Sequence, residues 1–374
     1  MQQLFKAHKV LICVGSGGVG KTTLSASLGI CAAQLGLKTL VMTIDPSRRL
    51  KVALGVDSST VKPVRVPGQK YSGELWACLL NAEEIFRDFI INSSTNPELA
   101  QQLLKNRLYQ QLSTTLSGSQ EFTSLLQLTK ITQEQNYDLI ILDTPPAQHA
   151  IDFLEAPEKI RALFQDRVVR WFVGEEEGSS FIQKIIARST HIVLSALERI
   201  TGSTFMKELN HFFATVRTVQ AKISERTEIV QEILHAESTG FLLVTGFDEA
   251  KLREAEALFG YLDSNKYHLR GAFINRAFVP ALRPLPAATE PKLVAEYAQW
   301  ATFYQSREVF FQDFTEKWQA RVPVVRLPEL SQDTSGLDGL EVFAHEMGSA
   351  YTQQNGHNNV STNHKPGAER VQPR

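Results

Sequence analysis

The stretch VLICVGSGGVGKTTLSASLGICAAQLG, residues 10–36, decides the fold. Within it, Gly15 to Thr22 match the pattern G-x-x-x-x-G-K-[ST] at every fixed position. The apolar run before this pattern predicts a buried strand, and Thr22 to Leu35 predict a helix that ends near Gly36. A strand, a glycine-rich loop and a helix in this order form a site for phosphate groups, because loop amides and the helix N-terminus both attract anions.

The fixed residues of the loop predict a site for ATP and a magnesium ion. Glycines allow the backbone N–H groups to turn toward phosphate oxygens. Lys21 is predicted to reach the β- and γ-phosphates, and the Thr22 hydroxyl to bind Mg²⁺. The alternative, a glycine-rich turn with a chance lysine, does not explain the strand and helix on either side. The predicted nucleotide-binding residues of the loop are Gly17, Gly18, Val19, Gly20, Lys21, Thr22 and Thr23.

Two aspartates end apolar runs and are candidates for the chemistry. Asp143 ends DLIILD, residues 138–143, where a carboxylate can hold a magnesium-bound water beside Thr22. Asp45 ends TLVMTID, residues 39–45, where a carboxylate can orient the attacking water. By position alone, Asp45 could equally well be a strand terminator, whereas for Asp143 the adjacent P-loop favours the magnesium site over an aspartate that ends a strand and caps a turn. For Asp143, the turn alternative is supported by the two prolines that follow Thr144.

The remaining apolar runs predict an α/β fold with a doubly wound, mostly parallel sheet. Several runs are apolar at every position, which is typical of strands covered by helices on both faces. Helical sequence lies between most of them, so the class is that of the P-loop nucleoside triphosphatases. The predicted strands are residues 10–15, 39–45, 75–80, 138–143, 241–246, 271–275 and 324–327.

Two gaps between these strands are too long for simple crossover connections. They predict one P-loop domain over residues 1–350, with a helical subdomain inserted at about 82–135 and 151–238. A long amphipathic helix is expected over 290–318. The end of the chain, 351–374, has little apolar content and is expected to be disordered.

Composition excludes several other classes of protein. The formal net charge of −1 over 374 residues gives no general attraction to nucleic acid or anionic lipid. No stretch of 18 apolar residues is present, so we expect no transmembrane segment. The N-terminus has no signal-peptide pattern, and the three cysteines stand apart. We therefore expect a cytoplasmic protein with buried, reduced thiols.

Taken together, four segments resemble the ArsA family of the MinD/ParA-like P-loop ATPases. These are GSGGVGKTT (15–23), TIDPSRRL (43–50), LDTPPAQHAIDFLEAP (142–157) and FINRA (273–277). The resemblance implies that Asp45 assists hydrolysis together with Lys21 and that Asp143 belongs to the magnesium site. It implies that Asn275 reads the adenine edge, and that His149 relays the nucleotide state or else only caps a helix. Residues 327–330, LPEL, resemble a loop that closes over the adenine.

The sequence departs from this family at an informative position. The family loop usually carries an extra lysine that reaches across a dimer, whereas this chain has Ser16. The resemblance implies an ATP-hydrolysing switch, working as a homodimer or with a homologous ATPase, that acts on a protein client or a membrane-associated partner. The alternative is a low-turnover nucleotide-binding subunit beside a catalytic homologue. Cysteine pairs for arsenite or zinc are absent, and the four methionines do not indicate a methionine-lined groove.

Overall fold

The computed structural model describes residues 1–43, 49–56, 62–94, 97–106, 119–144, 150–163, 208–209, 212, 220–278, 291–330 and 336–361. The chain divides into two compact units. The first comprises Met1–Leu79, Tyr137–Ala150 and Glu237–Arg374, and the second comprises Leu80–Asn136 and Ile151–Ala236.

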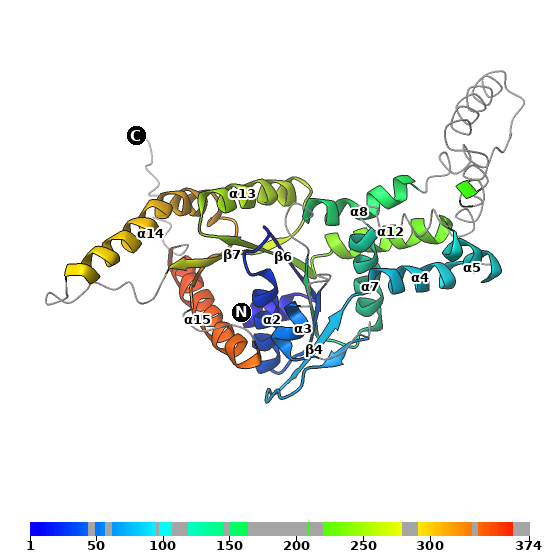
Figure 1. Ribbon diagram of the computed structural model, residues 1–374, viewed down its shortest axis with the longest axis horizontal. Helices are drawn as coiled ribbons and strands as arrows, with labels where there is room; N and C mark the ends of the chain where they lie inside the picture. The colour runs from blue at the N-terminus through cyan, green and yellow to red at the C-terminus, as the bar shows by residue number, and fades with distance from the viewer. Residues whose placement is uncertain are drawn as a thin grey trace, which may run out of the picture. The chain divides into compact units, whose positions relative to one another are not determined.

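The first unit is built on an eight-stranded sheet in the order β3-β4-β2-β5-β1-β6-β7-β8 (Figure 1). All neighbouring pairs are parallel except β3 and β4, which are antiparallel. This confirms the predicted α/β class and its mostly parallel sheet. The strands are β1 Val10–Gly15, β2 Lys38–Thr43, β3 Val64–Arg65, β4 Glu74–Leu79, β5 Leu139–Asp143, β6 Thr239–Gly246, β7 Leu269–Phe278 and β8 Val324–Pro328.

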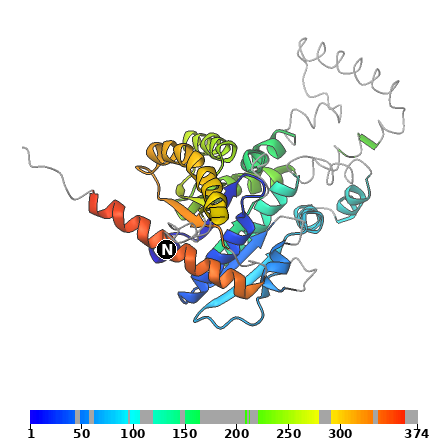
Figure 2. The ribbon, with the colours of Figure 1, turned by 60° about the vertical axis from the view of Figure 1, so that its left-hand side comes forward.

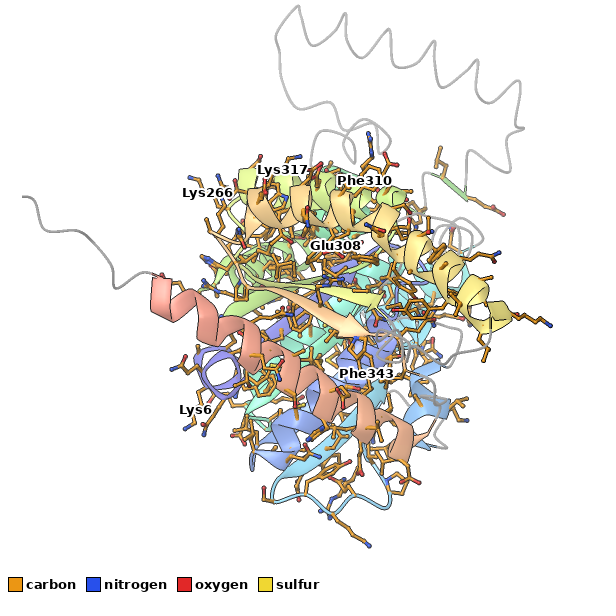
Figure 3. All side chains as sticks on the ribbon, turned by 90° about the vertical axis from the view of Figure 1, so that its left-hand side faces the viewer. Lys6, Lys266, Glu308, Phe310, Lys317 and Phe343 are labelled. Atoms are coloured by element: carbon orange, nitrogen blue, oxygen red, sulfur yellow. The ribbon has the colours of Figure 1, made fainter. Side chains whose placement is uncertain are left out.

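Helices cover both faces of this sheet, which explains why β1 and β5 are buried at every position. Figure 1 shows α13 and α14 over one face and α2, α3 and α15 over the other. In Figure 3, Glu308 of α14 and Phe343 of α15 lie on opposite sides of the strands. The helices are α1 Gln2–Ala7, α2 Lys21–Gln34, α3 Arg49–Leu54, α13 Glu249–Ser264, α14 Pro291–Trp318 and α15 Leu337–Ser361.

The second unit is helical in the residues that the structure describes. Its helices are α4 Ala82–Ser93, α5 Pro97–Lys105, α7 Ser119–Glu134, α8 Ala150–Leu163, whose first residue belongs to the first unit, and α12 Gln220–His235. α7 packs against both α4 and α12. Phe122 of α7 is fully buried and meets Phe89 of α4 edge to face, with ring centroids 6.5 Å apart.

The C-terminal end of the first unit corrects an expectation. Disorder was expected from residue 351, but α15 continues to Ser361 (Figure 2). The cause is specific packing: the Tyr351 ring is 9% exposed and stacks on Phe273 of β7 at 6.2 Å. The Gln354 side chain also accepts a hydrogen bond from the Arg326 backbone N–H at 3.1 Å. Residues 362–374 lie outside the described part of the chain.

Two further sequence-based expectations concern membranes and cysteines. Among the described residues, no helix is long and apolar enough to cross a membrane. Cys13, Cys31 and Cys78 are buried and form no disulfide among the described residues, as expected. Burial raises the pKa of each of these thiols to about 12, so they are unreactive at neutral pH.

Candidate active site

The glycine-rich loop lies between β1 and α2, at the centre of the sheet. Gly18 and Gly20 have φ angles of 76° and 92°, which L-residues with a side chain rarely adopt. A Cβ at Gly20 would also lie 2.4 Å from the Asn275 side-chain nitrogen. The loop conformation therefore depends on glycine at these two positions.

Lys21, the first residue of α2, turns its ammonium group back into the loop. Its Nζ donates hydrogen bonds to the backbone oxygens of Gly15 and Ser16, both at 2.9 Å. The side chain is only 7% exposed, so its charge sits within the curve of the loop. A buried ammonium within the loop is well placed to bind an anion there, because an anion compensates the desolvation of the charge.

An oxygen cluster lies beside the start of α2. The Thr22 hydroxyl donates to Asp143 Oδ2 at 2.7 Å, and the Thr43 hydroxyl donates to the same oxygen at 3.0 Å. Strand order explains the cluster, because β5 lies between β1 and β2 and Asp143 is in register with Thr43. Asp143 is 1% exposed, so its carboxylate is fixed in place.

This donor set fits magnesium. Mg²⁺ prefers oxygen ligands and usually takes only one or two from the protein, with water and phosphate oxygens completing the shell. Thr22 and Asp143 offer a hydroxyl and a carboxylate at one point. Among the residues described, no group of three or more His, Cys, Asp or Glu side chains could hold a metal by itself. The ion would therefore depend on nucleotide oxygens as well.

Asn275, in the C-terminal half of β7, contacts the loop. Its side-chain nitrogen donates to the Val19 backbone oxygen at 2.8 Å, and its Oδ1 accepts from the Arg276 backbone N–H at 3.0 Å. The residue is 6% exposed. The structure thus brings Asn275 to the loop that Lys21 and Thr22 form, although 256 residues separate it from Val19.

A pocket of about 250 Å³ opens beside the loop and Asn275. Its walls are the loop backbone at 17–19, the end of β7, the start of α13, one face of α14 and Glu329 after β8. Tyr304 of α14 donates its hydroxyl to Glu329 at 2.9 Å, and its ring stacks near Phe247 at 6.3 Å. Desolvation, followed by the bond to Glu329, raises the pKa of Tyr304 to about 12 and keeps the hydroxyl protonated. The pocket therefore combines aromatic and polar groups next to the phosphate loop.

Some of these residues were not predicted from the sequence. Thr43 was placed inside a strand that continued to Asp45, and only the register of β2 and β5 shows that it contacts Asp143. The α14 residues Phe303, Tyr304 and Arg307 share a helical face, but nothing in the sequence links that face to the loop. Conversely, Asp45 and His149 lie outside the described residues, so their roles stay predictions.

The fold and this loop define a P-loop ATPase: a parallel sheet, a lysine enclosed by the loop, and a threonine–aspartate pair at the adjacent strand ends. The sequence family is equally clear. A family model described as anion-transporting ATPase, ArsA_ATPase, matches residues 8–349, and the chain belongs to this family.

Two individual relatives match over 90% of the chain, and a third matches over about half of it. A putative arsenical pump-driving ATPase 1 of Aquifex aeolicus is 24% identical over 355 residues, which cover 90% of this chain and 78% of the relative. ATPase get3 of Schizosaccharomyces pombe is 24% identical over 342 residues, which cover 90% of each chain. An uncharacterized protein of Streptomyces coelicolor is 33% identical over 181 residues, 48% of this chain and 44% of that protein.

Proposed function

We propose that this ATPase binds ATP with magnesium and uses hydrolysis to switch the conformation of its helical unit, which acts on a partner protein. The observation that carries the proposal is the Thr22–Asp143 hydrogen bond beside the enclosed Lys21. This hydrogen bond connects the phosphate-binding loop with the C-terminal end of β5. From that end of β5 the chain continues into the helical unit.

Each loop residue has a defined task in this proposal. The backbone N–H groups at 17–23 and the Lys21 ammonium bind the phosphates. Thr22 and Asp143 hold the magnesium ion, which neutralises charge that develops on the phosphate oxygens. Asp45 orients the attacking water, and Asn275 recognises the base by its carboxamide edge. When the base binds, the Asn275 side chain either gives up its hydrogen bond to the Val19 backbone oxygen or shares it between that oxygen and the base.

The coupling follows from the order of the chain. Asp143 ends β5, and α8 of the second unit begins at Ala150, so only six residues separate the carboxylate from that helix. A change in the ligands of Asp143 on hydrolysis would displace the start of this connection. Loss of a phosphate contact is a common way to move a segment that follows a nucleotide site.

The partners follow from the relatives and remain part of the proposal. We propose that the chain forms a dimer with itself or with a homologous ATPase, in the cytoplasm, and acts on a protein client or a membrane-associated partner. The support is that relatives matched over 90% of the chain include a get3 ATPase. No nucleic-acid partner is proposed, because the formal net charge is −1.

Ser16 favours one alternative function, a nucleotide-binding subunit with slow turnover. Its hydroxyl is bonded to Glu254, and it cannot deliver a positive charge to a partner's phosphates. A homologous chain with lysine at this position would then provide the faster site.

Steady-state phosphate release tests the function and separates the two candidates. Purified protein is assayed with ATP and Mg²⁺ over a wide range of protein concentrations, with Lys21→Ala as the inactive control. Turnover that depends on Lys21 and Mg²⁺ supports the switch. The slow subunit is supported instead if the turnover of the unmodified chain alone equals that of the Lys21→Ala control. Its turnover should then rise when a homologue with lysine at this position is added.

A further inference from the structure

Ser16 occupies the loop position where the family usually has its extra lysine, and its side chain is not directed to the phosphate space. It is 2% exposed, and its hydroxyl donates to Glu254 Oε2 of α13 at 2.5 Å. The loop is therefore attached to α13 through this carboxylate.

A lysine shares the same carboxylate. Lys251, one turn earlier on α13, donates its Nζ to Glu254 Oε2 at 3.1 Å and lies 3.4 Å from Oε1. Ser16 and Lys251 therefore donate to the same carboxylate oxygen, so this oxygen links the ammonium group to loop position 16. The hydrogen bond from Ser16 is the larger cause, and that from Lys251 the next, of a Glu254 pKa below its usual range. The Glu254 carboxylate is therefore ionised at neutral pH and pairs with the Lys251 ammonium.

The Lys251 backbone is held firmly while its side chain remains accessible. Its N–H donates to the Asp248 carboxylate, which caps α13, at 3.0 Å. Its carbonyl accepts from the Thr245 hydroxyl at 2.8 Å. The side chain is 30% exposed and lines the same pocket as Gly17, Gly18 and Val19 of the loop. A fixed backbone with a flexible four-carbon stem lets the ammonium exchange one anionic partner for another.

We propose that Lys251 is a phosphate-binding residue that supplies, from α13 of the same chain, the positive charge that the loop lacks at Ser16. The inference rests on the proposed nucleotide site. Glu254 is the resting partner of Lys251, and a bound polyphosphate replaces it, while Ser16 keeps its bond to the carboxylate. Because Glu254 competes for the ammonium, only a ligand with several negative charges gains from the exchange.

A neighbouring cation of the pocket is less suited to this task. The Arg307 guanidinium lies 3.4 Å from the centre of the Phe303 ring and donates to the Phe303 carbonyl at 3.0 Å. These contacts hold it on α14. The Lys251 ammonium, by contrast, shares the Glu254 carboxylate with Ser16 of the loop.

The ordinary explanation of a Lys251–Glu254 contact is an exposed i,i+3 ion pair, which contributes little to stability and nothing to ligand affinity. The test must therefore measure affinity for phosphates. Binding of fluorescent ATP, ADP and AMP analogues is titrated at low protein concentration for Lys251→Met, Lys251→Arg and the unmodified chain. Arg253→Met is the matched control, because Arg253 lies on α13, pairs with Glu249 and does not line the pocket.

We expect Lys251→Met to weaken ATP binding about tenfold, as loss of a charge-assisted hydrogen bond does. The loss should be smaller for ADP and smallest for AMP. Lys251→Arg should recover most of the affinity, and Arg253→Met should change none of it. Glu254→Gln should tighten ATP binding, because it removes the competing charge. Equal ATP affinity for Lys251→Met and Arg253→Met, in samples with matching circular dichroism, would overturn the inference.

The same titration keeps this failure apart from failure of the proposed function. If Lys21→Ala loses ATP binding and Lys251→Met does not, the nucleotide site stands and the role of Lys251 is excluded. If Lys21→Ala binds ATP as well as the unmodified chain, the proposed function fails, and the inference fails with it.

Discussion

At the scale of single residues, the site combines groups that sequence patterns find easily with others that they do not. Lys21, Thr22, Asp143 and Asn275 were predicted from motifs, and the structure brings them to one loop. Motifs find such residues because they stand at fixed positions relative to a strand end. Thr43 depends instead on strand register, and Lys251 on the packing of α13 beside the loop. Neither relation can be predicted from the residues that adjoin Thr43 or Lys251 in the sequence.

Lys21→Ala should abolish tight ATP binding, because it removes the ammonium that the loop encloses. Titration of a fluorescent ATP analogue measures this. Lys292→Ala, at the exposed start of α14, is the matched control and should bind normally. Unchanged affinity in Lys21→Ala would remove the assignment of the loop as a phosphate site.

Asp143→Asn should separate magnesium binding from nucleotide binding. The variant keeps an oxygen acceptor for the Thr22 and Thr43 hydroxyls but lacks the charge that a divalent ion requires. We expect ATP affinity in EDTA to stay within about threefold of the unmodified chain. The gain in affinity and turnover on adding Mg²⁺ should be largely lost. An unchanged response to Mg²⁺ would show that Asp143 only anchors the two hydroxyls.

Asp45→Asn should leave ATP binding intact and slow hydrolysis by about a hundredfold or more, as loss of a positioned acid–base group usually does. The reason is its predicted place at the end of the strand after α2. Single-turnover phosphate release gives the rate of the chemical step. Equal rates in both proteins would make Asp45 a strand terminator.

At the scale of elements, the buried strands were predictable, whereas the short edge strand β3 and the end of α15 were not. Every predicted strand is present, because a short run that is apolar at each position has few stable alternatives to a strand covered on both faces. β3 was missed because it has only two residues, Val64 and Arg65, between prolines. The end of α15 was missed because its contacts, made by Tyr351 and Gln354, are with strands that are distant in the sequence.

Truncation measures how much the C-terminal part of α15, after Ala350, contributes to the free energy of unfolding. A chain that ends at Ala350 loses Tyr351 and the Gln354 hydrogen bond, and its free energy of unfolding should fall by about 3 kcal/mol. A chain that ends at Ser361 keeps both contacts and should unfold like the full chain. Chemical denaturation with urea provides the comparison. Equal midpoints for the two truncated chains would mean that the α15 extension adds no stability.

At the scale of the whole molecule, two units are connected through strands of one sheet. The second unit is entered after β4 and again after β5, and the chain returns from it before β6. Its long gaps were recognisable in the sequence. Many of its residues, including most of 164–219, lie outside the described chain, so the helical subdomain expected over that part of 151–238 stays a prediction there.

Hydrogen exchange on the intact protein tests the coupling between these units. ATP with Mg²⁺ should slow exchange in β1, β5 and α2, because a ligand that binds only the native state raises the energy of local opening. If hydrolysis switches the helical unit, exchange in α8 and α7 should also differ between ATP and ADP. Lys21→Ala should show neither effect. Differences confined to the first unit would argue against the proposed switch.

The central position of β1 has a consequence for synthesis of the protein. This strand is made first, yet its neighbours are β5 and β6, which leave the ribosome more than a hundred and more than two hundred residues later. The loop also depends on Asn275 of β7 for its contact with Val19. A nascent chain therefore carries its nucleotide motif long before it carries a nucleotide site. Until β6 emerges, the apolar strand lacks a neighbour and is prone to non-native association, and until β7 emerges ATP cannot assist folding.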